Sequence, residues 1–500
     1  MLSESVSGFS PTITTTTTIT TTAAATTTSS AIVAIINIIN TAITIISSSL
    51  FAKSIAVCGV SLKELQHDRC LCLKEIHAGE LRKPIAFVSI DRESFLVAEQ
   101  DGRIYHYIYG NTGAANQSEE LQRQLPRKKK ILDLSNRVAY NKERPVDERG
   151  LMSVTTHPQF KSNKKLYVYY IAAGHESAVI SQFRFLDNQL ENVTSEEIIV
   201  MIPRQRRSQE NGGQILFGTD GLLYVSVGSG FGHWTHLAQN MSTFVGKILR
   251  INVDVPSADR LYSIPTDNPF INTSDATPEI YALGIKNSWR CSVDQGDPLT
   301  GTGRGRIFCG DVGDQMFEEI NIIYKEGNYG WNLREGHRCR RNRVCNSETI
   351  RNEIFPIATY KHSYNRKVII GGYVYRGRKI PHLNGKYIFG DFLNIDLFLL
   401  NEMPTGHWSE SKLTYCESIK CESNNSEAQK NQYILSFGED IEGELYMLTT
   451  SDLFGYQSSG HVYSIRSKSR DGSSHQRTST VFTTFMLLII LVVKEHLVFG

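Results

Sequence analysis

The segment from Gln209 to Val227 constrains the fold of this chain more than any other segment does. It reads QENGGQILFGTDGLLYVSV, in which a glycine pair precedes an apolar run, a Thr-Asp-Gly turn and a second apolar run. Glycine accepts backbone angles that other residues avoid, and Asp-Gly between two β-rich runs is a hairpin signal. The segment therefore predicts two short antiparallel strands joined by a tight turn.

The same pattern of short apolar runs and Gly or Asp turns recurs along most of the chain. Further examples are FLVAEQDGRIYHYIYG, KILRINVD, RIFCGDVG, GKYIFGDF and LYMLTT. Strands of this length with regular turn signals are typical of all-β sandwiches, barrels and propellers. Roughly 400 residues arranged in blades of four strands make about six blades. We therefore predict an all-β domain, a six-bladed β-propeller, over residues 70–467.

Positive and negative charges are almost balanced. The 500 residues include 53 Lys and Arg and 51 Asp and Glu, which gives a formal net charge of +2 at pH 7. Such a balance creates no strong field for a polyanion. We therefore do not expect nucleic acid as a partner.

Most of the nine cysteines lie in close pairs along the chain. Zinc is the rival explanation for such pairs, but no CxxC and no CxxC…HxxxH spacing occurs. We therefore expect disulfides, and with them an oxidising compartment. The predicted bonds are Cys291–Cys309 and Cys339–Cys345, with Cys70 and Cys72 bonded to Cys416 and Cys421. The remaining cysteine is expected to be Cys58, either free or bonded to another chain.

The two ends of the chain differ in composition from the part between them. Residues 1–30 are rich in Thr, Ser and Ala, which predicts disorder. Residues 31–56 contain an uncharged, isoleucine-rich run, which predicts a cleaved signal peptide or, alternatively, a signal anchor. Residues 471–500 join a polar linker to the run VFTTFMLLIILVV, which predicts a glycosylphosphatidylinositol-anchor signal; a transmembrane tail and a buried strand are the alternatives. Together the two apolar runs predict a secreted protein, or one held at the outer cell surface by a terminal segment.

Five Asn-x-Ser/Thr sequons accompany these segments. They begin at Asn116, Asn192, Asn240, Asn272 and Asn424. In a secreted protein such sequons are acceptors of N-linked glycans. We therefore predict a glycoprotein.

Several long sequence blocks resemble the glucose/sorbosone dehydrogenase family, and within it the Hedgehog-interacting-protein-like group. They include DERGLMSVTTHPQF, GGQILFGTDGLLYV and PEIYALGIKNSWRCSVDQGDP, and the resemblance runs from about Cys70 to Ile465. It implies a six-bladed propeller like that of soluble quinoprotein glucose dehydrogenase. In bacterial members of the family, the central funnel holds pyrroloquinoline quinone above a calcium ion.

Three positions depart from the enzymes that this sequence resembles. Where the family reads NHNGG and uses the histidine as a base, this chain has Glu210. Histidine suits the role because its pKa lies near working pH. Ser229 replaces the aspartate of a GDG turn, and Ile395 and Asp396 replace a Gly-Arg pair. We therefore expect no catalytic residue and no bound cofactor, with quinone and calcium implied by the family resemblance alone.

Other polar residues have both a functional and a structural interpretation. By resemblance, Asn287 and Arg376 stand at cofactor-contacting positions, but a turn residue and a blade-edge charge would look the same. Asp311 and Asp314 flank glycine in GDVGD, where they would ligate calcium or simply form a turn. The acidic pair Glu318–Glu319 is expected to face solvent.

Two features bear on the partner. The basic stretches Arg204–Arg207 and Arg338–Arg343 are charged loop faces or contacts for a glycosaminoglycan. In the Hedgehog-binding relative, an acidic loop reaches a metal of the ligand; here the matching loop, Phe231–Asn240, has His233 and His236 but no Asp or Glu. Hedgehog binding by that route is therefore not expected. The sequence predicts an extracellular propeller that binds a protein or glycan; the alternative is a quinone- and calcium-dependent sugar dehydrogenase with an altered base.

Overall fold

The structure is a computed structural model that describes residues 70–467, except for 110–125, 142, 145, 176, 204–208, 341–342, 347, 364 and 422–431. The predictions for the two terminal regions, for Cys58, for Arg204–Arg207 and for the sequons at Asn116 and Asn424 therefore lie outside the described residues. Within the described part of the chain, no helix is long and apolar enough to cross a membrane.

Six β-sheets account for nearly all of the regular structure, as predicted. The first contains β2 (Pro84–Ser89), β3 (Ser94–Glu99), β4 (Arg103–Ile108) and β5 (Arg127–Asp133). The second contains β6 (Leu151–Thr156), β7 (Lys165–Ile171), β8 (Ala178–Arg184) and β9 (Glu197–Ile202). The third contains β10 (Gly212–Phe217), β11 (Leu223–Val227), β12 (Lys247–Ile251) and β13 (Ile280–Leu283).

The other three sheets continue the series. The fourth contains β14 (Ser288–Val293), β15 (Ile307–Asp311), β16 (Phe317–Ile323) and β19 (Ala358–Lys361). The fifth contains β20 (Ile369–Val374), β21 (Tyr387–Asp391), β22 (Leu397–Glu402) and β23 (Trp408–Lys412). The sixth contains β25 (Tyr433–Glu439), β26 (Leu445–Thr450), β27 (Gly460–Ser467), β1 (Leu71–Leu81) and β24 (Tyr415–Lys420).

Short elements complete the description. They are the hairpin of β17 (Arg334–Glu335) and β18 (Arg338–Cys339), the helix α3 (Phe160–Asn163), and the 3-10 helices η2 (Gly232–Gln239) and η3 (Pro381–Leu383).

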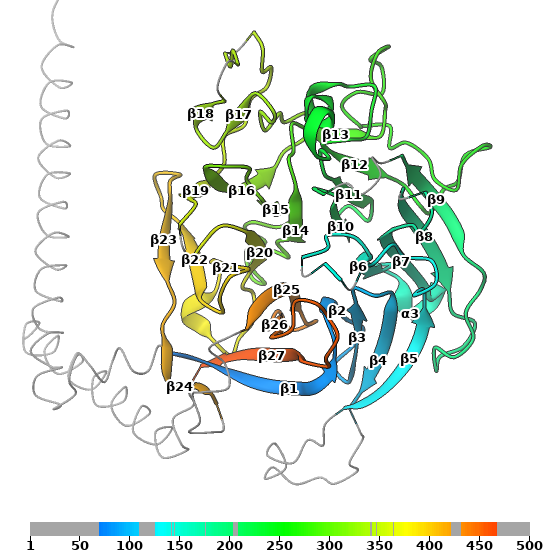
Figure 1. The fold of residues 1–500 in the computed structure, drawn as a ribbon, viewed down its shortest axis with the longest axis vertical. Helices are drawn as coiled ribbons and strands as arrows, with labels where there is room; N and C mark the ends of the chain where they lie inside the picture. The colour runs from blue at the N-terminus through cyan, green and yellow to red at the C-terminus, as the bar shows by residue number, and fades with distance from the viewer. Residues whose placement is uncertain are drawn as a thin grey trace, which may run out of the picture. The chain divides into compact units, whose positions relative to one another are not determined.

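The six sheets are the blades of a propeller arranged around one axis (Figure 1). The first strand of each blade, namely β2, β6, β10, β14, β20 and β25, contacts the first strand of the next blade, and the ring closes between β25 and β2. The pattern of hydrophobicity follows this geometry. The interior strands β11 and β12 are buried along their whole length, whereas β23, with the sequence WSESK, lies at an outer edge and is mostly exposed.

The ring is closed by strands from both ends of the described region. β1 pairs antiparallel with β27 and parallel with β24, so the first strand completes the last blade (Figure 1, blue beside orange-red). Two disulfides, Cys70–Cys416 and Cys72–Cys421, fasten β1 to β24, with sequence separations of 346 and 349. Closing a loop of this length stabilises the fold by on the order of 5 kcal/mol in the chain-entropy model.

Two further disulfides are local, and all four bonds are those expected from the sequence. Cys291 and Cys309 face each other in the register of β14 and β15. Cys339 and Cys345 close a short loop after β18.

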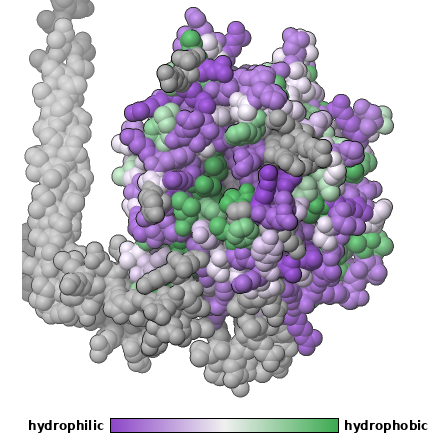
Figure 2. Space-filling model, viewed as in Figure 1, coloured by the Kyte–Doolittle hydropathy of each residue, from purple (hydrophilic) through white to green (hydrophobic). Residues whose placement is uncertain are grey.

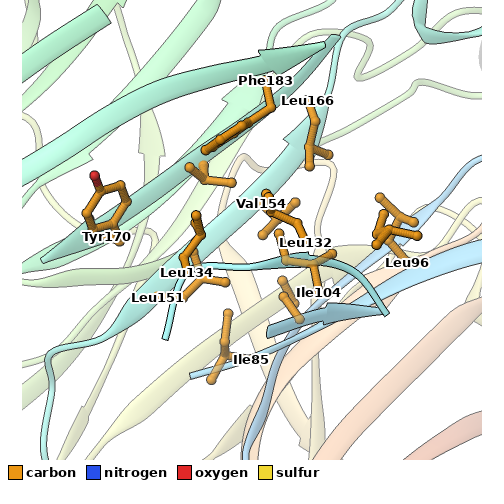
Figure 3. Close-up of a cluster of buried hydrophobic side chains, with 14 of the residues drawn as sticks. Ile85, Leu96, Ile104, Leu132, Leu134, Leu151, Val154, Leu166, Tyr170 and Phe183 are labelled. Carbon is orange, nitrogen blue, oxygen red and sulfur yellow. The ribbon is translucent and has the colours of Figure 1, made fainter. Parts of the chain in front are cut away.

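The core consists of apolar layers between neighbouring blades. In Figure 3, side chains of the first blade meet those of the second. The labelled residues are Ile85, Leu96, Ile104, Leu132 and Leu134 on one side, and Leu151, Val154, Leu166, Tyr170 and Phe183 on the other. Burying each such side chain contributes about 1.5–3 kcal/mol, so these layers hold the blades in register and fix the inner strands around the axis.

Candidate functional site

A cluster of polar side chains lies where the inner strands begin, and we call it the strand-start cluster. Glu148 precedes β6, Glu210 precedes β10, and Lys286 and Asn287 precede β14. Ser229 joins them from the turn after β11 through its hydroxyl, which donates to Glu210 Oε2 at 3.2 Å. Since the inner strands are neighbours around one axis, residues far apart in sequence meet at this end of the propeller.

A buried ion pair occupies the centre of the strand-start cluster. Lys286 Nζ lies 2.9 Å from Glu210 Oε1, and the two side chains are only 7% and 10% exposed. Burial opposes the charged form of Lys286, but attraction to Glu210, Asp311 and Glu148 outweighs it and raises the lysine pKa. With Ser229 on the other oxygen, both oxygens of Glu210 are engaged.

The backbone at Glu210 is also specialised. Its φ is +61°, in the left-handed region that a residue with a side chain enters only under strain. The neighbouring chain comes so close that a Cβ at Gly228 would lie 2.1 Å from the Glu210 carbonyl oxygen. Glycine is therefore required at position 228, and the turn after β11 holds the Glu210 backbone in place.

Trp331 covers the ion pair. Its indole Nε1 donates to Ser229 Oγ at 3.0 Å, and Lys286 Nζ lies 5.5 Å from its ring centroid. The Arg340 guanidinium lies 4.3 Å from the same ring, in the range of a cation–π contact. The tryptophan thus joins the charged pair to the loop that carries Arg340.

Asn287 links two of the inner strands. Its Oδ1 accepts the Gly212 N–H at 2.8 Å, and its Nδ2 donates to Glu148 at 3.4 Å. Glu148 also accepts the Glu210 N–H at 2.6 Å, and burial raises the pKa of Glu148. Asn287 therefore satisfies backbone and side-chain groups inside the cluster, consistent with its structural interpretation.

The two aspartates suggested as calcium ligands have different partners. Asp311 accepts the backbone N–H groups of Lys286 at 3.1 Å and Asn287 at 2.5 Å, and burial raises its pKa to about 6. Asp314 instead pairs with Arg340 at 2.8 Å. Among the described residues, no three His, Cys, Asp or Glu side chains are placed to hold a metal ion.

The expectation that the pair Glu318–Glu319 faces solvent is wrong. Glu318 is fully buried and accepts the Gly313 N–H at 3.1 Å and the Ile369 N–H at 2.8 Å. His362 Nε2 lies 2.6 Å from Glu318 Oε1, the oxygen that also accepts the Gly313 N–H. Burial raises the pKa of Glu318, and the contact with His362 opposes that rise. β16 is an interior strand of its blade, so neither acid lies at a blade edge, and Glu319 is partly buried.

Glu319 is a carboxyl group in an unusual electrostatic environment. It accepts the Gly336 N–H at 2.6 Å, while burial and the nearby Asp311 raise its pKa to about 8. Glu319 therefore favours its protonated form at neutral pH.

Arg376 and Asp396 lie away from the strand-start cluster. Arg376 follows β20, at the opposite end of the inner strands from Asn287, and binds Asp294 through two contacts of 2.7 and 2.9 Å. Asp396 pairs with Lys412 of the outer strand β23 at 2.7 Å. The two residues assigned to cofactor contact by resemblance are thus not brought together.

The surface features predicted from the sequence are placed as follows. The sequon asparagines Asn192, Asn240 and Asn272 are exposed. The loop Phe231–Asn240 forms η2, in which His233 and His236 are exposed. Buried Lys247 donates to the carbonyl groups of Leu237, Ala238 and Val245, which anchors this helix to β12.

Sequence reasoning missed three members of the site, namely Glu148, Lys286 and Trp331. For Glu148 and Lys286 the available signal was a charged residue just before an apolar strand, as in DERG and GIKN. Their pairing was not readable, because the partners belong to different blades.

Comparisons with known proteins agree with this architecture. Residues 81–419 match the family model described as Glucose / Sorbosone dehydrogenase, and the chain belongs to that family. HIPL1 protein of Arabidopsis thaliana is 35% identical over 274 residues, which cover 49% of this chain and 39% of that protein. Hedgehog-interacting protein of Mus musculus is 29% identical over 421 residues, which cover 81% of this chain and 54% of that protein. The matched region is therefore about half, or less, of these relatives' own length.

Solved structures of the same architecture include two aldose sugar dehydrogenases. The PQQ-bound form from Streptomyces coelicolor has a TM-score of 0.55 at 17% identity and covers 80% of this chain and 98% of that one. The apo form from Escherichia coli has a TM-score of 0.55 at 19% identity and covers 79% and 99%. At these identities the likeness establishes the propeller fold alone.

Proposed function

We propose that this propeller is an extracellular or cell-surface binding protein that does not oxidise sugars. The observation that carries the proposal is the engagement of Glu210, which stands where the family's enzymes have their base. A general base must present a free lone pair to the substrate hydroxyl. Here one carboxylate oxygen bonds to Lys286 and the other to Ser229.

The strand-start cluster also fits a bound quinone poorly. Pyrroloquinoline quinone carries carboxylates, and the cluster already contains the acidic side chains Glu148, Glu210 and Asp311. Lys286 is the cation among them, and its charge is matched by Glu210. Arg376, the other cation suggested by resemblance, is bound to Asp294 at the far end of the strands. A further anion in this environment would be repelled.

A protein is the partner class that the comparisons favour. Hedgehog-interacting protein is similar to this chain over most of the propeller, and its name denotes protein binding. Four disulfides suit an oxidising compartment, and exposed sequons suit the secretory pathway. A glycosaminoglycan is the second class, supported by exposed Arg338 and Arg343.

Two experiments test the proposal. Dye-linked oxidation of aldoses, with quinone and calcium supplied, should show no turnover by this chain and full turnover by the Escherichia coli aldose sugar dehydrogenase assayed in parallel. Cross-linking on living cells should capture an extracellular protein. Loss of that capture in Arg338→Ala/Arg343→Ala, together with retention on heparin by the unmodified chain, would assign the partner to the glycosaminoglycan class instead.

The alternative is a sugar dehydrogenase with an altered base. Its support is the fold shared with the aldose sugar dehydrogenases and the place of Asn287, which bonds to Glu148, the same side chain that accepts the Glu210 N–H. Turnover by the unmodified chain that disappears in Glu210→Gln would establish this alternative and refute the binding-protein proposal.

A further inference from the structure

A second polar site lies on the propeller axis, at the end of the inner strands opposite the strand-start cluster. It is a cavity of about 440 Å³ lined by the later residues of the inner strands and the residues that follow them. Its apolar wall includes Val154, Leu216 and Phe437. The face drawn in Figure 2 has apolar side chains near its middle, and most of the surface around them is polar. A cavity of this volume is in the range of small-molecule sites.

Arg290 closes the inner end of this axial cavity. Its Nε donates to Ser436 Oγ of β25 at 3.0 Å, and an Nη donates to the Ile85 carbonyl of β2 at 3.1 Å. Neither strand neighbours β14 in the ring, so the side chain crosses the axis. The third contact, to the Trp289 carbonyl at 3.0 Å, is also to a neutral acceptor.

The guanidinium of Arg290 is buried without a counter-ion. It is 5% exposed, and none of the ion pairs formed by the described residues includes it. Burial lowers its pKa to about 10. A buried charge without a partner is costly, and a bound anion would relieve that cost.

A carboxyl group that lines the same cavity is suited to a positively charged ligand group. Glu439, at the end of β25, lines the cavity, and burial together with repulsion from Asp440 and Asp294 raises its pKa to about 8. Asp294 already holds the nearby cations Arg376 and Arg306. Without a ligand Glu439 therefore favours its protonated form at neutral pH. No ion pair among the described residues includes it, and a bound cation would favour its carboxylate form.

A hydroxyl group in the cavity wall also lacks a partner. Ser292 lies two residues after Arg290 on β14, is 3% exposed, and its Oγ has no hydrogen-bond partner among the described residues. Such buried polar atoms in proteins are nearly always satisfied. Beside Arg290, a hydroxyl donor suits a carboxylate.

We propose that the axial cavity binds a small zwitterion, namely a free amino acid with an apolar side chain. Its carboxylate is held by Arg290 and Ser292, its ammonium by Glu439, and its side chain by the apolar wall. The carboxylate of such a ligand supplies the counter-ion that Arg290 lacks, and its ammonium group stabilises the carboxylate form of Glu439. The inference is independent of the function proposed for the strand-start cluster.

The test is calorimetric titration of the full chain with the twenty amino acids, followed by matched probes for each charge. For leucine, the probes are 4-methylpentanoate, which lacks the amine, and 3-methylbutylamine, which lacks the carboxylate. At least one apolar amino acid should bind, and each single-charge probe should bind at least tenfold more weakly. No binding by any amino acid, or equal binding by one of the single-charge probes, would overturn the proposal.

Variants locate the ligand. Glu439→Gln should weaken amino-acid binding at least tenfold without changing the affinity for 4-methylpentanoate, and Ser292→Ala should weaken both. Glu442→Gln is the matched control. Glu442 lies three residues after Glu439 in the chain and pairs with Arg92 on the surface. Amino-acid binding that survives Glu439→Gln unchanged, in a variant with the melting temperature of the unmodified chain, would contradict the assignment.

Discussion

Lys286 Nζ lies 2.9 Å from Glu210 Oε1 inside the propeller, and the two residues precede the inner strands of adjacent blades. Each charge is buried with the other as its main compensation. The pair therefore joins two blades, and by the sequence resemblance Glu210 stands where the family's enzymes carry their base.

Removing one member of this pair should be far more damaging than removing both. Lys286→Met leaves the Glu210 charge buried and unpaired, which typically costs about 3–5 kcal/mol of unfolding free energy. The double variant Lys286→Met/Glu210→Gln should recover most of that loss. Urea unfolding measures both effects. Lys412→Met, which breaks the exposed pair with Asp396, is the control and should cost about 1 kcal/mol or less. A double variant no more stable than Lys286→Met would contradict the account.

The fold was predictable because its signals are local. Hairpins such as the one that follows Gly213 are predicted by two apolar runs with an Asp-Gly turn between them. The close pairs of cysteines likewise suggested the disulfides that close the ring. The site was less predictable because it depends on contacts between blades. Glu318 looks like a surface acid in its sequence, and only the placement of His362 and the Ile369 amide shows why it is buried.

Stability should fall with rising pH because of Glu319. Its pKa in the folded protein is raised to about 8, whereas the unfolded chain releases the proton near the usual value of about 4.3. Between these values the unfolded state binds fewer protons, so the unfolding free energy decreases as pH rises. Glu319→Gln should be at least about 1 kcal/mol more stable than the unmodified chain at pH 8, and little changed near pH 4.

Urea unfolding from pH 4 to pH 8 checks this difference. Glu348→Gln, at an exposed position, serves as the control and should leave the pH profile unchanged. If Glu319→Gln and the unmodified chain lose stability in parallel, the protonated state assigned to Glu319 is wrong.

The two disulfides between β1 and β24 should act redundantly. Cys70–Cys416 and Cys72–Cys421 close nearly the same loop, so either bond alone restrains the unfolded chain. Replacing one pair with serine should cost about 1–2 kcal/mol, and replacing both pairs should cost roughly 5 kcal/mol. Non-reducing peptide mapping identifies the bonds, and urea unfolding measures the costs. Equal losses for the single and the double removal would show that ring closure does not depend on these bonds.

Glycans should occupy the exposed sequons if the chain enters the secretory pathway. Asn192, Asn240 and Asn272 are each on the surface of the propeller, where an oligosaccharide meets no steric obstacle from a core. Protein made in animal cells should gain gel mobility after enzymatic removal of N-linked glycans, and each Asn→Gln change should remove one step. An unchanged mobility, together with free thiols at the paired cysteines, would count against secretion.

We propose that the engaged carboxylate of Glu210 leaves this propeller without the quinone chemistry of the family's enzymes. The most direct test of this proposal is equilibrium titration of pyrroloquinoline quinone, in the presence of calcium, into the unmodified chain and into Glu210→His, which removes this carboxylate from the strand-start cluster. We predict no saturable binding to the unmodified chain, and binding that appears only in Glu210→His would support the proposal. Saturable quinone binding to the unmodified chain, followed by aldose-dependent reduction of the bound quinone, would contradict the claim.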